Sequence, residues 1–222
     1  MLVARRGLRR EDRARRGRAA VTKMARVASR RARRGARVSV GASGTVATAR
    51  GEAWRWCVHD TWLGPLLLCA SARGLVHAGL RVDDPSALLS NLARRAGREA
   101  SCVESRADLA PALLQLDEYF AGRRMVFDHP LDAIGGAFDQ RVWELERRIP
   151  LGSTRTYGDL AREIGLPGAA RAVGGATGRN PLLLFVPCHR VVSSTGLGGF
   201  SAQGGAATKA RLLSFEGVLL AT

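Results

Sequence analysis

The segment Thr156–Ala176 reads TYGDLAREIGLPGAARAVGGA and holds the turn that decides how the C-terminal half folds. Thr156, followed three residues later by Asp159, is a capping-box pattern that begins a helix, and Gly165 ends that helix. Pro167 suits the first turn of a second helix. Two short helices joined in this way predict either a DNA-binding helix-turn-helix or an ordinary helical hairpin.

The second helix of this pair, residues 168–176, is unusual in its glycine content. Each interior glycine costs roughly 1 kcal/mol relative to alanine, so Gly174 and Gly175 need a reason. One interpretation is that a DNA groove approaches the backbone closely, with Arg171 as the one long cationic side chain. The other is tight packing of one helix against another. The residues alone leave both open.

Downstream, the apolar run Leu182–Val186 and Pro187 lead directly into Cys188. A thiol is a weak nucleophile at its free pKa of about 8.5, and a neighbouring base or cation produces more thiolate. His189 is a candidate base, acting directly or through a water, and Glu216 is a candidate carboxylate that orients the imidazole. The alternative is a buried structural cysteine beside a surface histidine and arginine.

The N-terminal half predicts a different architecture. Short apolar runs separated by glycine turns indicate an antiparallel meander, with strands at 54–62, 65–70 and 75–81. Helical spacing of apolar residues predicts helices at about 85–96, 109–120 and 138–149. A short strand is expected at 101–104. The chain is therefore expected to be α+β, with an N-terminal α+β domain at 51–135 and a mostly helical domain at 136–222.

The charge of the chain is concentrated at its N-terminus. The formal net charge is +16, and residues 1–50 hold 16 basic against 2 acidic residues. Residues 51–222 hold 19 basic against 17 acidic residues. We predict that residues 1–50 are a disordered Arg-rich tail. Its interpretation stays open between a dispensable or artefactual extension, an auxiliary nucleic-acid-binding arm and a transit peptide.

Composition excludes several classes of protein. The longest apolar runs fall far short of the roughly 20 residues that span a membrane, and no apolar core follows the basic N-terminus as in a secretory signal. The four cysteines are too few and too scattered for a disulfide scaffold, which favours a cytoplasmic location. Cys57, His59, Cys69 and His77 lie near one another in sequence, but their spacing does not predict structural zinc.

Taken together, the motifs resemble the O6-alkylguanine-DNA alkyltransferases, the methylated-DNA–protein-cysteine S-methyltransferases. The resemblance extends from about residue 55 to residue 217. The matching blocks are Asp117–Arg124, Ile149–Thr154, Thr156–Ala161, Arg171–Ala176, Asn180-Pro181, Pro187–Val191, Lys209 and Leu212–Gly217. The resemblance implies a ribonuclease H-like N-terminal domain, followed by a winged-helix-like domain that contains the helix-turn-helix.

The resemblance also implies a reaction. Cys188 would accept the methyl group from O6-methylguanine, and from O4-methylthymine, in a single-turnover suicide reaction without a cofactor. His189 would deprotonate the thiol through a water and would be held by Glu216. Tyr157 and Lys209 would help to neutralise the departing guanine.

The implied partner is double-stranded DNA that carries O6-alkylguanine, bound by a monomer that does not associate with membranes. The target base would flip out of the stack, and Arg171 would fill the gap, on a helix lying in the minor groove with Gly174 and Gly175. Asn180 would structure the active-site turn. Val191 and Ser201 would contact the guanine.

Two features depart from the family pattern. Phe200 stands where many members have tyrosine, and the loop 196–209 differs in spacing. Two other functions are weighed against alkyl transfer. The first is a module that binds alkylated DNA without repairing it; such a module would lack the acceptor cysteine, so the presence of Cys188 argues against it. The second is a cysteine hydrolase using Cys188, His189 and Glu216, which would need an oxyanion site that no motif supplies.

Overall fold

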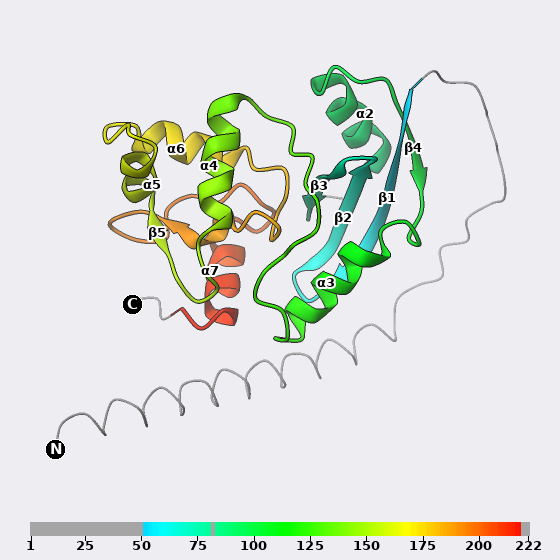
Figure 1. Cartoon of the computed structure of the whole chain (residues 1–222). Coiled ribbons are helices and arrows are strands. Elements are labelled where there is room, and N and C mark those ends of the chain that lie inside the picture. The colour runs from blue at the N-terminus through cyan, green and yellow to red at the C-terminus, as the bar shows by residue number, and fades with distance from the viewer. Residues whose placement is uncertain (1–50, 81–82, 219–222) are drawn as a thin grey trace.

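The computed structural model describes residues 51–80 and 83–218, so the tail predicted for residues 1–50 lies outside the described residues. Figure 1 shows two parts side by side, a β-sheet with two helices and a helical part. The first part comprises β1 (Glu52–Thr61), β2 (Gly64–Ser71), β3 (Gly74–Gly79), α2 (Pro85–Arg95), β4 (Ala100–Glu104) and α3 (Ala110–Phe120). The second comprises α4 (Ala137–Arg147), β5 (Arg155–Thr156), α5 (Tyr157–Glu163), α6 (Ala170–Gly178), the 3-10 turn η2 (Cys188–Arg190), β6 (Val191–Val192) and α7 (Gly205–Phe215). The α+β fold class is confirmed.

The sheet is mixed, whereas the sequence predicted an antiparallel one. The strand order is β3-β2-β1-β4, and the meander β1–β3 is antiparallel as expected. The difference lies in β4, which pairs with β1 in the parallel direction. The helix α2 carries the chain from β3 across the sheet to its opposite edge, and such a strand–helix–strand crossover returns the next strand in a parallel direction.

Alternation along the strands gives the sheet two apolar faces. Trp54, Leu67 and Val76 point to the face covered by Leu89 and Leu92 of α2. Their neighbours in sequence point to the other face, where α3 and the C-terminal part contribute to one continuous core. Successive strand residues face opposite sides, so a shift of one residue in register would exchange the two cores.

The helical part follows its local signals. Thr156 Oγ1 accepts from the backbone N–H of Asp159 at 3.1 Å, and the Asp159 carboxylate accepts from the Thr156 N–H at 2.8 Å, which completes the capping box. Helix α5 ends before Gly165, which has a φ of 78°. Helix α6 then packs against both α5 and α4. In residues 51–80 and 83–218, no helix is long and apolar enough to cross a membrane.

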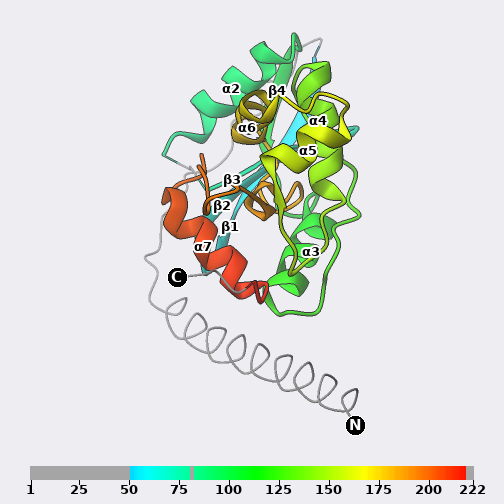
Figure 2. The same ribbon diagram turned by 90° about the vertical axis from the view of Figure 1, so that its left-hand side faces the viewer.

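The two parts are joined along the edge strand β3. The Ala78 N–H donates to Pro181 O, and the Leu183 N–H donates to Ala78 O, both at 2.9 Å. Figure 1 shows β3 as the strand nearest the helical part, and Figure 2 shows the same molecule from the side of the helical part. The apolar run that precedes Cys188 is therefore fixed against the sheet, and this contact determines where the cysteine lies.

Candidate active site

Cys188 lies at the end of a tight chain reversal. The Val186 N–H donates to Leu182 O at 2.8 Å, and Leu184 within this reversal has a φ of 74°, a strained value for a residue with a Cβ. The Asn180 side chain braces the reversal from inside, since its Nδ2 donates to Val186 O at 2.8 Å and its Oδ1 accepts from the Leu182 N–H at 2.9 Å. The backbone geometry of this reversal thus positions the cysteine.

The Cys188 thiol is buried, with 5% of the residue exposed. Burial raises the pKa of the thiol to about 12, and the negative charge of Glu146 acts in the same direction. Asn180 and the Lys209 ammonium lower the pKa and only partly offset this. The resting sulfur is therefore a protonated thiol at neutral pH, and any nucleophilic chemistry requires removal of its proton.

His189 is held in one tautomer by Glu216. Its Nε2 lies 2.9 Å from Glu216 Oε1, and both side chains are inaccessible to solvent. Burial lowers the pKa of His189 despite the Glu216 charge, so the imidazole is neutral. Because a carboxylate only accepts hydrogen bonds, Nε2 carries the proton. The lone pair on Nδ1 is then free, and among the described residues this atom has no hydrogen-bond partner. A neutral imidazole in this tautomer can act as a base.

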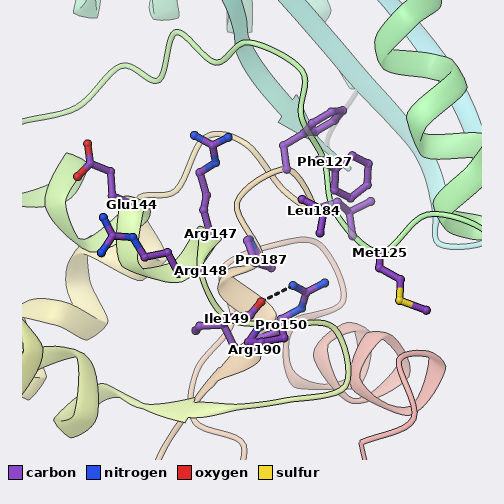
Figure 3. A pocket seen from close by; sticks show the side chains of 12 residues that line it. Met125, Phe127, Glu144, Arg147, Arg148, Ile149, Pro150, Leu184, Pro187 and Arg190 are labelled. Atoms are coloured by element: carbon purple, nitrogen blue, oxygen red, sulfur yellow. Dashed lines mark hydrogen bonds between the residues drawn. The ribbon is translucent and has the colours of Figure 1, made fainter.

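Glu216 is ionised because two other side chains also donate to it. Arg190 donates from Nε and Nη2, both at 2.8 Å, and the Tyr119 hydroxyl donates at 2.8 Å. Burial by itself raises the pKa of Glu216, but the hydrogen bonds from His189 and Arg190 outweigh it and lower the pKa to about 2. Arg190 also donates to the carbonyl of Ile149, as the dashed line in Figure 3 shows.

Sequence reasoning missed two members of this network. It treated Arg190 as a surface residue in the structural alternative, but the guanidinium is buried and paired with Glu216. The signal for Arg190 was its position beside Cys188 and His189. Tyr119 is 97 residues from Glu216, so no local pattern indicated it.

Lys209 and Tyr157 converge on one backbone carbonyl. Lys209 Nζ donates to Gly199 O at 3.0 Å, and the Tyr157 hydroxyl donates to the same oxygen at 3.4 Å. The ammonium lies 5.8 Å from the centre of the Tyr157 ring. Burial lowers the pKa of Lys209 to about 8 and raises the pKa of Tyr157. The two predicted residues are thus brought together, and a tyrosine hydroxyl and a partly charged ammonium can both donate to a leaving group.

Only some of the residues predicted to contact DNA lie close together. Tyr157 and Arg171 line the same groove, with exposed Arg171 near the start of α6. A Cβ on Gly174 would lie 3.8 Å from the Tyr157 ring, and one on Gly175 would lie 3.2 Å from the Arg179 guanidinium. The first distance is an ordinary van der Waals contact and does not require glycine at position 174, whereas a Cβ at position 175 would press on the Arg179 side chain.

Val191 and Ser201, the predicted guanine contacts, differ sharply in exposure. Val191 is fully buried in β6, where it pairs with Arg155, and Ser201 is exposed in the loop before α7. Phe200 packs against the core through its ring. Among residues 51–80 and 83–218, no group of three or more His, Cys, Asp or Glu side chains is arranged to hold a metal ion.

Comparison with known proteins identifies the family. Residues 55–133 match the ribonuclease-like domain of 6-O-methylguanine DNA methyltransferase, and residues 137–218 match its DNA binding domain. A methylated-DNA–protein-cysteine methyltransferase of Mycobacterium leprae (strain TN) is 40% identical over 158 residues, which cover 71% of this chain and 88% of that protein. A relative from Methanosarcina acetivorans with the same name is 36% identical, over 73% of this chain and 97% of its own length.

Solved structures agree. The crystal structure of Mycobacterium tuberculosis O6-methylguanine methyltransferase has a TM-score of 0.64 at 36% identity and covers 74% of this chain and 93% of its own. The tuberculosis protein in complex with DNA has a TM-score of 0.59 at 38% identity and covers 74% and 92%. The chain therefore belongs to the 6-O-methylguanine DNA methyltransferase family and is a methylated-DNA–protein-cysteine methyltransferase, a DNA repair enzyme.

Proposed function

We propose that Cys188 is the alkyl acceptor of this enzyme, and that its substrate is double-stranded DNA carrying O6-methylguanine. The supporting observation is a buried thiol next in sequence to a buried neutral imidazole, whose Nδ1 is left unprotonated because Nε2 donates to Glu216. O4-methylthymine presents a methyl group on a base oxygen in the same way, and we include it as a substrate. The solved complex of a relative with DNA supports the choice of partner.

The reaction begins with proton removal. His189 Nδ1 accepts the proton of the Cys188 thiol, directly or through a water, and the Glu216 carboxylate stabilises the imidazolium that forms. Arg190 keeps Glu216 ionised throughout, since it holds both carboxylate oxygens. The carboxylate therefore orients the ring and does not itself take the proton.

The thiolate then displaces guanine from the methyl carbon. A sulfur–carbon bond forms, the carbon–O6 bond breaks, and the electron pair stays on the guanine. Tyr157 and Lys209 are the donors that neutralise this charge, because both already aim at one acceptor, the carbonyl of Gly199. The product is a thioether, which no step returns to a thiol, so each molecule reacts once.

A buried acceptor requires the base to leave the duplex. Extruding a nucleotide costs a few kcal/mol in lost stacking and pairing. We propose that Arg171 occupies the vacated stack, and that α6 enters the minor groove, where exposed Gly175 lets the phosphodiester backbone approach. Shared lining of one groove by Arg171 and Tyr157 supports this arrangement.

The test is the mass of the protein after incubation with a duplex oligonucleotide that carries O6-methylguanine. We expect a stoichiometric gain of one methyl group, mapped to the peptide that contains Cys188 and absent from Cys188→Ala. Cys102→Ala removes a cysteine from β4 and serves as the matched control that should retain transfer. A methyl group on another residue, or repeated turnover by one molecule, would contradict the proposal.

A further inference from the structure

A buried carboxyl group on α4 has no role in the steps above. Glu146 is 0% exposed, and neither of its carboxyl oxygens has a hydrogen-bond partner among the described residues. Burying a carboxyl group without a partner is costly, so such groups are rare and call for an explanation. Helix α4 packs against α6 and against the Cys188–Arg190 turn, which brings this carboxyl to the rear of the proposed site.

The groups that face Glu146 come from every element packed around it. Lys209 on α7 is fully buried, and its ammonium interacts with both Glu146 and Cys188. Tyr157 on α5 is influenced by the charges of Cys188 and Glu146, and Thr177 on α6 faces the carboxyl without an ordinary hydrogen bond. The cluster therefore contains one cation, Lys209, and three groups that can become anions, Glu146, Cys188 and Tyr157.

Burial accounts for the unusual titration of this cluster. It raises the pKa of Glu146 to about 8 and lowers the pKa of Lys209 to about 8, while the Lys209 charge pulls the pKa of Glu146 back down. An ionised Glu146 further raises the pKa of the Cys188 thiol. Lys209 is the only lysine outside residues 1–50, so among the described residues it is the only ammonium that can serve both Glu146 and Cys188.

We propose that Glu146 is a positioning residue for alkyl transfer, whose carboxyl competes with the Cys188 thiolate for the buried Lys209 ammonium and so sets the pH range in which Cys188 reacts. This inference rests on the proposed role of Cys188 as the acceptor. A protonated Glu146 leaves Lys209 to stabilise the thiolate. An ionised Glu146 pairs with the Lys209 ammonium and repels the thiolate. Once the sulfur is methylated it carries no charge, and Glu146 becomes the counter-ion that Lys209 needs.

The test uses the full chain with Glu146→Gln, which keeps the shape of the side chain and removes its charge. The single-turnover rate of methyl transfer from an O6-methylguanine duplex is measured across pH. We expect the midpoint of the pH–rate profile to fall by about one pH unit, because removing a like charge lowers the pKa of the thiol. At a fixed pH above about 8, where Glu146 of the wild type is ionised, and below that midpoint, the rate should rise about tenfold.

A second measurement does not depend on DNA. It is the rate at which iodoacetamide alkylates Cys188, and peptide mass spectrometry separates this reaction from alkylation of Cys57, Cys69 and Cys102. At the same pH as the transfer assay, this rate should also rise about tenfold in Glu146→Gln. If this rate rises but the methyl group from DNA arrives elsewhere, the proposed acceptor is wrong while the charge competition stands. If the methyl group arrives on Cys188 with unchanged pH dependence, the competition is wrong.

Three variants separate charge from packing. Glu146→Asp keeps a carboxyl and should keep the wild-type midpoint, whereas Glu146→Leu should reproduce the shift of Glu146→Gln and guards against poor folding of that variant. Glu144→Gln removes the same charge from the exposed side of α4 and should change nothing. If the role of Glu146 were purely structural, these variants would alter the stability to urea without moving the midpoint of the pH–rate profile. The proposal would be overturned if Glu146→Gln and Glu146→Leu both had the pH–rate midpoint and the iodoacetamide rate of the wild type.

Discussion

Replacing Tyr119 with phenylalanine tests the buried network that holds His189. Tyr119 belongs to α3 of the N-terminal part, is 1% exposed and donates to Glu216 Oε1 at 2.8 Å. Burial raises the pKa of its hydroxyl well above the ordinary value, so the group remains a donor. Phenylalanine keeps the ring and its contacts with Phe120, Phe127 and Phe215, so Tyr119→Phe removes one hydrogen bond and almost nothing else.

The magnitude follows from what Glu216 retains. A hydrogen bond to a charged group contributes about 1.5–3 kcal/mol to the free energy of unfolding. In Tyr119→Phe the carboxylate still accepts from His189 and from two nitrogens of Arg190, so it is not left without partners. We therefore expect the lower end of that range, about 1.5 kcal/mol. With a urea dependence of roughly 2 kcal/mol per molar, the unfolding midpoint should fall by about 0.5–1 M.

The assay is equilibrium urea unfolding of the full chain at neutral pH, followed by fluorescence. The chain has only two tyrosines, and Tyr157→Phe is the matched control, since the Tyr157 hydroxyl makes a long 3.4 Å bond near the surface. That control should shift the midpoint by less than about 0.2 M while slowing methyl transfer. Tyr119→Phe should lower the urea midpoint and leave the rate of methyl transfer unchanged, because His189 retains its hydrogen bond to Glu216. A Tyr119→Phe midpoint equal to that of the wild type would refute the energetic reasoning about this network.

Three further outcomes are expected. The pKa of Glu216 is lowered to about 2, so its stabilising contribution is complete above the ordinary value of 4.5 and is lost as pH falls toward 2; the difference in urea midpoint between wild type and Glu216→Gln should shrink over that range. Arg171→Ala should slow methyl transfer about tenfold on duplex DNA but little on a single-stranded oligonucleotide, and equal slowing on both would contradict a role in filling the stack. Gly198→Ala introduces a Cβ 2.9 Å from the Tyr157 ring at a φ of 70°, so it should slow methyl transfer and lower the free energy of unfolding by roughly 1 kcal/mol, or about 0.5 M in urea midpoint; unchanged kinetics would show that Tyr157 adapts freely.

Part of the candidate site was predictable because its signals are local. The capping box at Thr156 and the apolar run before Cys188 operate over a few residues, where backbone geometry and burial leave little freedom. Glu146 also had a local signal that was not used. It stands four residues after Val142 and three before Ile149, on the buried stripe of α4, where an acidic residue is out of place.

The sequence by itself determined the two-part α+β organisation, the approximate bounds of α2, α3, α4 and α5, and the segment that carries the cysteine, since each depends on periodicity and caps within one element. It placed the start of α6 two residues early, at 168 in place of Ala170, and did not indicate α7. Only the tertiary structure decided which groups meet. The parallel pairing of β4 follows from the path of α2 across the sheet, and the contact of Tyr119 with Glu216 joins residues 97 positions apart. Such contacts arise when separate apolar faces pack into one core. They set the pKa of His189 and Lys209 by excluding water, and that of Glu216 through the hydrogen bonds that it accepts.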